Sequence, residues 1–342
     1  MIEKSLTVKV LSVFLLTVFL LNCKEKEKIP EVITEQQAEN TEEQPEVIIT
    51  EPVKEETKET TVSVSYQSSG NYSIPQLPAG RVNTREINPI NYENPDLDIL
   101  RQMGVQQYLI SFLAGEQFYK NGEYDKALIE YNASINNNGD FAESFISRGN
   151  TYLKRGEYSR AIEDYTRSLR LDSSKAEVYN YRGYARSQRG EYSLAIEDFS
   201  RAVALNRNYT DALVNRSYAY YESGDYDKVI EDCNLIIALE PANSGIWNRR
   251  GSAWYRKEND DRAISDFTEA IRLRSDYTVA YYNRGNAYYN KREFEKALAD
   301  LNKAIALNPS YASAYTSRGN VYRLLGNNEN AEADFAAARR LR

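Results

Sequence analysis

The sequence predicts an all-α protein, a solenoid of two-helix hairpins, and three regularities support this prediction. The first is a small residue that recurs every 34 positions: Gly115, Gly149, Gly183, Ser217, Gly251, Gly285 and Gly319. The second is an alanine-rich series in register with it: Ala127, Ala161, Ala195, Val229, Ala263, Ala297 and Ala331. The third is the spacing of apolar residues between these markers, which follows the period of an amphipathic helix. A fixed period of this length is typical of a repeat array.

The predicted array consists of seven repeats without an insertion. Their bounds are 108–141, 142–175, 176–209, 210–243, 244–277, 278–311 and 312–342. In the sixth repeat, "AYYNRGNAYYNK" is the predicted first helix and "FEKALADLNKAIALNP" is the second. The turn between them often contains glycine, which suits a left-handed helix stop. Counted from the start of each repeat, positions 8 and 20 have little or no side chain, so the helices can pack closely and neighbouring hairpins can stack.

This pattern resembles the tetratricopeptide repeat. The matching features are an aromatic residue at position 4, glycine at 8, tyrosine at 11, alanine at 20, an aromatic residue at 24, a small residue at 27 and sometimes proline at 32 (Pro241 and Pro309). The resemblance covers about two thirds of the chain. It implies a right-handed superhelix with a concave groove, whose usual ligand is a peptide segment.

The amino terminus predicts export. Lys4 and Lys9 precede an apolar run from Val10 to Leu21, which has the length of a signal-peptide core and is shorter than the roughly 20 residues of a membrane span. The run ends at "LLNC", which resembles a bacterial lipobox. We therefore expect a signal peptide over residues 1–22 and a lipid, such as palmitate, on Cys23. The predicted location is the bacterial cell envelope, on the outer membrane or another periplasmic face.

Residues 23–91 are predicted to be a disordered acidic tether behind the lipidated cysteine. Between Lys24 and Val64 the chain has twelve Glu and five Lys and few large apolar residues, so it cannot bury enough surface to offset its chain entropy. Residues 92–107 then predict an N-terminal capping helix, which begins with Asn94 and Pro95. At the other end, position 21 becomes Glu332 and position 28 becomes Arg339, so we expect a polar cap that disfavours end-to-end stacking.

The composition argues against an enzyme and against nucleic-acid binding. The chain has no histidine, which removes the commonest general base and the commonest metal ligand. No phosphate-binding loop, paired-cysteine motif or nucleophile elbow is present, so we expect no cofactor, no metal and no catalytic residue. The formal net charge is −7, and no basic stripe favours nucleic acid. Cys233 replaces the larger residue at position 24 of the fourth repeat, where Ser217 and Val229 are larger than usual, so we expect it to be a small core residue.

Two features appear together in the last six repeats and predict a structural ladder. Position 7 is arginine in Arg148, Arg182, Arg216, Arg250, Arg284 and Arg318. Position 23 is aspartate in Asp164, Asp198, Asp232, Asp266, Asp300 and Asp334. A guanidinium suits bidentate pairing with a carboxylate, within or between hairpins. The alternative is a row of arginines that binds an anionic ligand.

The resemblance places positions 2, 5, 9, 12 and 13 of each first helix on the groove. The candidate groove residues are Asn150, Tyr184, Tyr218, Tyr221, Tyr255, Tyr282, Asn286, Tyr289, Asn320 and Arg323. Asparagine offers a donor and an acceptor to a peptide backbone, and tyrosine offers apolar area with a polar tip. The predicted function is a lipid-anchored adaptor that binds extended or helical segments of envelope proteins. The alternative is a glycan- or peptidoglycan-binding protein that uses the tyrosine-lined groove.

Overall fold

The computed structural model describes residues 104–341, which form fourteen α-helices and, within that range, no β-strand. The predicted signal peptide, Cys23, the tether and most of the capping helix lie outside the described residues. The helices are α3 (Gln107–Lys120), α4 (Tyr124–Asn137), α5 (Ala142–Lys154), α6 (Tyr158–Leu171), α7 (Ala176–Gln188), α8 (Tyr192–Leu205), α9 (Thr210–Glu222), α10 (Tyr226–Leu239), α11 (Ser244–Arg256), α12 (Asp260–Leu273), α13 (Thr278–Asn290), α14 (Phe294–Leu307), α15 (Ala312–Leu324) and α16 (Asn328–Arg340).

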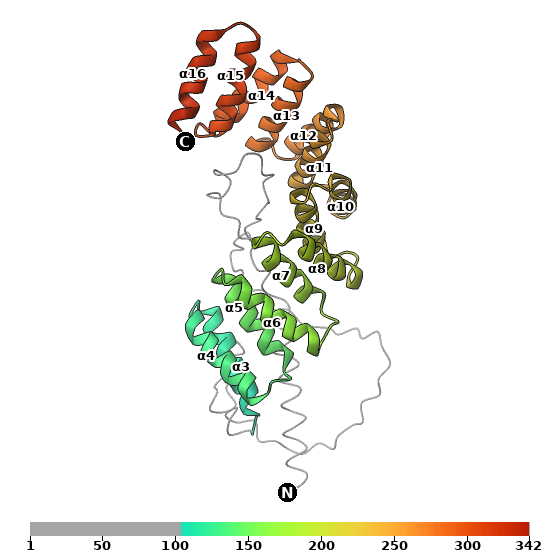
Figure 1. Cartoon of the computed structure of the whole chain (residues 1–342), viewed down its shortest axis with the longest axis vertical. Coiled ribbons are helices and arrows are strands. Elements are labelled where there is room, and N and C mark those ends of the chain that lie inside the picture. The colour runs from blue at the N-terminus through green and yellow to red at the C-terminus, as the bar shows by residue number, and fades with distance from the viewer. Residues whose placement is uncertain (1–103, 342) are drawn as a thin grey trace, which may run out of the picture. The chain divides into compact units, whose positions relative to one another are not determined.

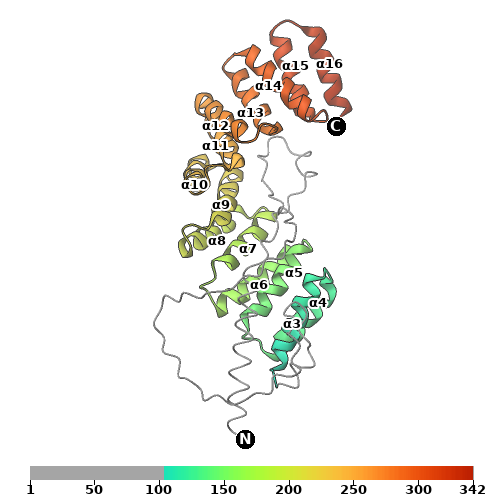
Figure 2. The same cartoon turned by 180° about the vertical axis from the view of Figure 1, so that it is seen from behind.

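The helices form seven hairpins that stack in chain order (Figures 1 and 2). Each odd-numbered helix packs on the even-numbered helix that follows it, and from α5 to α15 each also packs on the even-numbered helix before it. Most odd-numbered helices also contact the next odd-numbered helix, so they line one side of the array. From α5 to α15, every odd-numbered helix begins at the first residue of a 34-residue repeat. The predicted all-α solenoid of hairpins is therefore confirmed.

A left-handed residue ends the first helix of each hairpin. After α5, Gly156 has φ 72°, its N–H donates to Leu153 O at 3.0 Å, and the N–H of Glu157 donates to Tyr152 O at 2.9 Å. This is the Schellman arrangement, which satisfies the last carbonyl groups of a helix. In two hairpins this left-handed residue is not glycine: Glu258 has φ 57° and Arg292 has φ 61°.

The small residue at position 8 allows an aromatic ring at position 24 to lie against the first helix. A Cβ at Gly251 would lie 2.7 Å from Phe267 Cε1, which is too close for an unshifted side chain. The fourth repeat combines Ser217 with Cys233, and both are fully buried. The smaller side chain at position 24 thus accompanies the larger one at position 8, as a core of fixed volume requires.

Candidate functional site

The arginine at position 7 pairs with the aspartate of its own hairpin in six repeats. Arg284 Nε donates to Asp300 Oδ2 at 2.7 Å, and Nη2 donates to Oδ1 at 2.8 Å. Arginine Nε and Nη2 make the same contacts in the pairs Arg148–Asp164, Arg182–Asp198, Arg216–Asp232, Arg250–Asp266 and Arg318–Asp334. Burial raises the pKa of the Asp164 and Asp232 carboxyl groups, and the arginine hydrogen bonds oppose this shift. The pairs therefore offset a desolvation cost that the array itself creates.

The remaining terminal nitrogen of each arginine reaches the preceding hairpin. Arg284 Nη1 donates to Thr268 Oγ1 at 3.0 Å. The acceptor is always the polar side chain at position 25 of the preceding repeat: Asn132, Thr166, Ser200, Asn234, Thr268 and Asn302. The seventh repeat, which no further repeat follows in this sequence, has Ala336 there. Each arginine thus joins two hairpins as well as the two helices of its own.

Aromatic rings at position 4 lie against five of these guanidinium groups. Arg250 Cζ lies 4.7 Å from the centroid of the Trp247 ring. The same contact joins Arg148 to Phe145, Arg182 to Tyr179, Arg284 to Tyr281 and Arg318 to Tyr315. Because Nε, Nη1 and Nη2 all have partners inside the array, this row of arginines has little capacity left for an anionic ligand.

The candidate groove residues lie on the other side of the odd-numbered helices. Residues two apart in an α-helix differ in direction by about 200°, so positions 5 and 9 point away from position 7. Eight candidates are half-buried: Asn150, Tyr184, Tyr218, Tyr255, Tyr282, Asn286, Tyr289 and Asn320. Arg323 is exposed, whereas Tyr221 is only 8% exposed and belongs to the core around Val229. The array therefore places Tyr221 in its core, where it offers little area to a ligand.

Several candidate tyrosines pack their rings against the aromatic rings of residues from neighbouring segments. Tyr221 lies 5.4 Å from Tyr226, centroid to centroid, and Tyr289 lies 6.2 Å from Phe294. Tyr282 lies 5.0 Å from Tyr311, which follows the next helix. These contacts restrict the positions of the rings.

The amides at position 9 differ in how far they are already engaged. Asn150 Oδ1 accepts from the Tyr165 hydroxyl at 2.7 Å, and Asn320 Oδ1 accepts from Arg323 Nη2 at 3.1 Å. Their NH₂ groups therefore remain as donors. Asn286 is half-buried and makes no hydrogen bond to another described residue, so its donor and its acceptor are both open.

The groove positions implied by the resemblance include Asn180 and Asn248 at position 5, and the structure adds a pairing of these amides that was not predicted from the sequence. Asn215 Nδ2 donates to Asn180 Oδ1 at 3.0 Å, and Asn283 Nδ2 donates to Asn248 Oδ1 at 3.2 Å. Each bond joins position 6 of one repeat to position 5 of the repeat before it. The signal was present in the sequence, since the Asn–Asn pair recurs after two repeats.

Between these two amide pairs, position 6 is an arginine that lies inside the protein. Arg249 is 2% exposed, and its Nη1 donates to Val214 O and to Ser217 Oγ, both at 2.8 Å. Its Nε has no partner among the described residues. Burial raises the pKa of the nearby Glu222 carboxyl and of the Tyr218 hydroxyl, and the positive charge of Arg249 opposes both shifts. The fourth and fifth hairpins therefore meet at a buried charge.

Residues 104–341 contain neither a side-chain cluster for a metal ion nor a candidate membrane span. No group of three or more carboxylate or cysteine side chains in this range is placed to hold a metal ion. Within the same range, no helix has both the length and the apolar character needed to cross a membrane.

Comparison with protein families identifies the repeat. Two models are described as tetratricopeptide repeat. The first matches residues 176–209 and 278–311, and the second matches residues 210–243 and 312–341. A third model, described as TPR repeat, matches residues 149–188. No curated protein matches the chain.

One solved structure shares the fold, and two others are similar over about half of this chain. The C-terminal part of a TPR repeat-containing protein from Cytophaga hutchinsonii is similar with a TM-score of 0.57 and 18% identity, over 67% of this chain and 95% of that one. MamA protein is 27% identical over 50% of this chain and 93% of its own, with a TM-score of 0.49. YrrB, described as a TPR protein with an unusual peptide-binding site, is 24% identical over 54% of this chain and 95% of its own, also at 0.49.

Proposed function

The chain belongs to the tetratricopeptide-repeat family, and from that premise we propose that it is an exported, lipid-anchored adaptor whose groove binds peptide segments of other envelope proteins. The repeats support the general role of a protein-interaction scaffold. The groove, the ligand class and the location are the specific parts of the proposal.

The observation that carries the proposal is the open amide of Asn286 between two anchored tyrosines. An extended peptide presents alternating N–H and C=O groups, and an asparagine side chain can satisfy one of each. Tyr282 and Tyr289 are half-buried near it on α13, so they offer apolar area at a small cost in side-chain entropy. By contrast, Arg284 on the other side of the same helix is already bound to Asp300 and Thr268.

The alternative ligand is a glycan, which tyrosine would bind through an open ring face. Tyr221, Tyr282 and Tyr289 each have another ring within 6.2 Å, so part of their ring area is already in contact with the protein. Isothermal titration with peptidoglycan fragments and with unstructured peptides separates the two ligand classes. Heat released by the fragments alone would favour the glycan.

The direct test is a crosslinking pull-down from envelope that compares the wild type with Asn286→Ala/Tyr289→Ala. We expect the double variant to lose partners that the wild type recovers. Lys303→Ala, an exposed change on α14, is the matched control and should retain them. Because Tyr289 packs near Phe294, thermal melting must show that both variants are folded. Equal recovery of every partner would remove the groove from the mechanism.

Membrane attachment is tested separately. The apolar run before Cys23 motivates the proposed lipid anchor, and a palmitate analogue should label the wild type but not Cys23→Ala. Label that survives the substitution would contradict the anchor without touching the groove.

We also expect copies not to stack through the last helix. Glu332 and Arg339 on α16 are exposed, at positions where the other six repeats have Leu, Ile or Val. Concentration-dependent growth of long assemblies in sedimentation, abolished by a change on α16, would contradict this expectation.

A further inference from the structure

One cation on the ladder side of the array differs from its counterparts. Position 19 is basic in five repeats: Lys126, Arg160, Lys228, Arg262 and Lys296. Four of these form an ion pair with a glutamate three residues before or after them, at position 16 or 22. In the fifth repeat those positions are Asn259 and Ser265, and no carboxylate among the described residues lies within ion-pair distance of Arg262.

The nearby carboxylates are engaged elsewhere. Asp261 pairs with Lys291, and Asp260 accepts from Asn290 Nδ2 at 3.3 Å. Asp266 is held by both nitrogens of Arg250 that face it. Arg262 is therefore the one cation of these five that forms no ion pair among the described residues.

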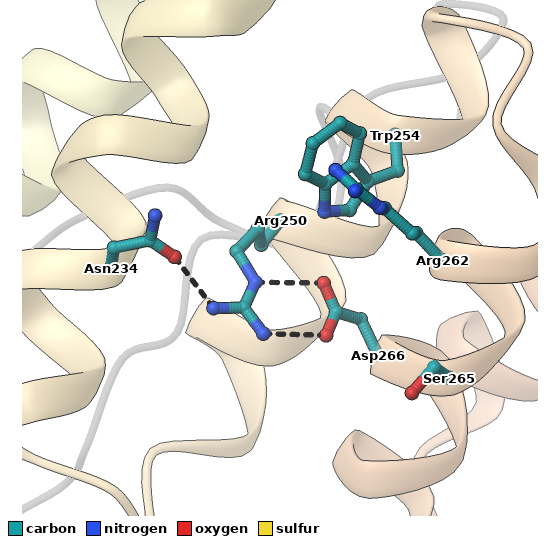
Figure 3. Close-up of a pocket in the computed structure, with 6 residues that line it drawn as sticks. All are labelled: Asn234, Arg250, Trp254, Arg262, Ser265 and Asp266. Carbon is teal, nitrogen blue, oxygen red and sulfur yellow. Dashed lines mark hydrogen bonds and ion pairs between the residues drawn. The ribbon is translucent and has the colours of Figure 1, made fainter.

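A pocket of about 260 Å³ lies beside this charge (Figure 3). Its lining comes from three helices of two repeats: Asn234 on α10, Arg250 and Trp254 on α11, and Arg262, Ser265 and Asp266 on α12. The Arg262 guanidinium lies against the Trp254 ring (Figure 3), with Cζ 4.4 Å from the ring centroid. Stacking on the indole fixes one face of the guanidinium and leaves the N–H groups at its edge as donors.

Of the other polar groups of the pocket, Arg250 and Asp266 are bound to each other, whereas Asn234 and Ser265 still have a donor. Asn234 Oδ1 accepts from Arg250 Nη1 at 2.6 Å, so its NH₂ group is the part left for a ligand. Ser265 is exposed and has a hydroxyl that can donate. The N–H edge of the Arg262 guanidinium, which has no ion-pair partner among the described residues, matches an oxyanion with a planar pair of oxygens, which is a carboxylate.

We propose that this pocket binds the side chain of a glutamate or aspartate of a partner protein. The volume is small compared with the roughly 300–1,000 Å³ of sites for larger ligands, so it suits a side chain. Ser252 lies at position 9 of α11, on the groove side. Trp254 comes two residues later, so its side chain points about 200° away around the helix axis. The acidic contact would therefore lie on the opposite side of α11 from the proposed groove, and a partner there would leave the groove free.

The chain supplies its own reporter, since Trp247 and Trp254 are its two tryptophans. We would follow the two indole N–H resonances of the ¹⁵N-labelled full chain at low salt, assigned with Trp247→Phe, while adding acetyl-Gly-Glu-Gly-amide. We expect the Trp254 resonance to shift until it saturates as the glutamate peptide is added. The same peptide with glutamine in place of glutamate should cause no such shift. Arg262→Gln should weaken binding about tenfold, the value of one charge-assisted hydrogen bond.

Two matched variants sharpen the test. Ser265→Glu restores the glutamate that stands at position 22 of repeats two to four, and it should abolish binding by pairing with Arg262. Lys296→Gln makes the equivalent change in the next repeat and should leave binding unchanged.

Several results would overturn the proposal. These are equal shifts with the glutamine peptide, an Arg262→Gln variant that binds as well as wild type, or a response to inorganic phosphate but not to the glutamate peptide. A Trp254 shift caused merely by deleting residues 31–64 would assign the pocket to the chain's own acidic segment instead. Because the readout is local to α11, its failure would leave the groove proposal standing, and loss of groove binding would leave this one standing.

Discussion

The bond between Arg284 and Thr268 predicts that neighbouring hairpins are coupled through the ladder. Arg284 is 16% exposed and Asp300 is 9% exposed, so removing the arginine alone leaves a nearly buried carboxylate. Breaking such a pair costs about 3–5 kcal/mol when it is fully buried, and we expect about 2–3 kcal/mol here because water reaches the arginine. Thr268→Ala removes only the neutral acceptor and should cost about 0.5–1.5 kcal/mol.

Double-mutant cycles in urea separate the two contributions. We expect the Arg284→Leu/Asp300→Leu and Arg284→Leu/Thr268→Ala pairs both to show coupling, with the first larger. Ala336→Thr is the matched control, because it introduces the position 25 hydroxyl where no arginine follows, and it should change nothing. Unfolding must be followed by two probes, since repeat arrays need not unfold in one step. Zero coupling in both cycles would refute the ladder.

Three further predictions concern the packing of single hairpins. Gly251→Ala should lower the free energy of unfolding, measured by thermal melting, by about 1–2 kcal/mol, because the new Cβ meets Phe267. Gly285→Ala should lower it less, because the nearest atom there, Leu301 Cγ, lies 3.0 Å from the new Cβ. Glu258→Gly should raise it by about 0.5–1 kcal/mol in the same assay, because it relieves a left-handed residue; a loss would show that the side chain at that turn makes a stabilising contact. Burial raises the pKa of Cys233 to about 12, so this thiol should stay protonated at pH 8 and react with a disulfide reagent only after urea is added.

Much of the architecture could be predicted because it depends on spacing alone. The 34-residue period fixes where helices begin, and the small residue at position 8 fixes how closely the second helix approaches. The partner of Arg284 in the preceding hairpin could have been found as well, since position 25 is polar in six repeats and becomes Ala336 in the last. A polar residue on a helix surface usually needs no explanation, however, and only the packed hairpins show that Thr268 lies within reach of Arg284.

The groove was harder to predict because side-chain direction depends on the neighbouring hairpin. Position 12 is tyrosine both in the fourth repeat (Tyr221) and in the sixth (Tyr289), yet Tyr221 is buried and Tyr289 is half-buried. The difference arises in the fourth repeat, where Val229 and Ile236 enlarge the core that Tyr221 joins. No single-repeat pattern contains that information.

Two departures of the fourth repeat, Ser217 and Cys233, accommodate one buried charge. Ser217 replaces the usual glycine and supplies a hydroxyl that accepts from Arg249, which glycine cannot do. Its side chain fits because Cys233 takes the place of the aromatic ring that would otherwise meet a Cβ there, as Phe199 would at Gly183. At this junction α9 and α11 approach each other less closely than the other consecutive odd-numbered helices do. A guanidinium with one unpartnered nitrogen is expensive to bury, and apolar residues would pack the junction at lower cost. Arg249 therefore weakens the array locally while placing a fixed positive charge beneath Tyr218 and Glu222, on the side of the array where we propose that the partner peptide binds.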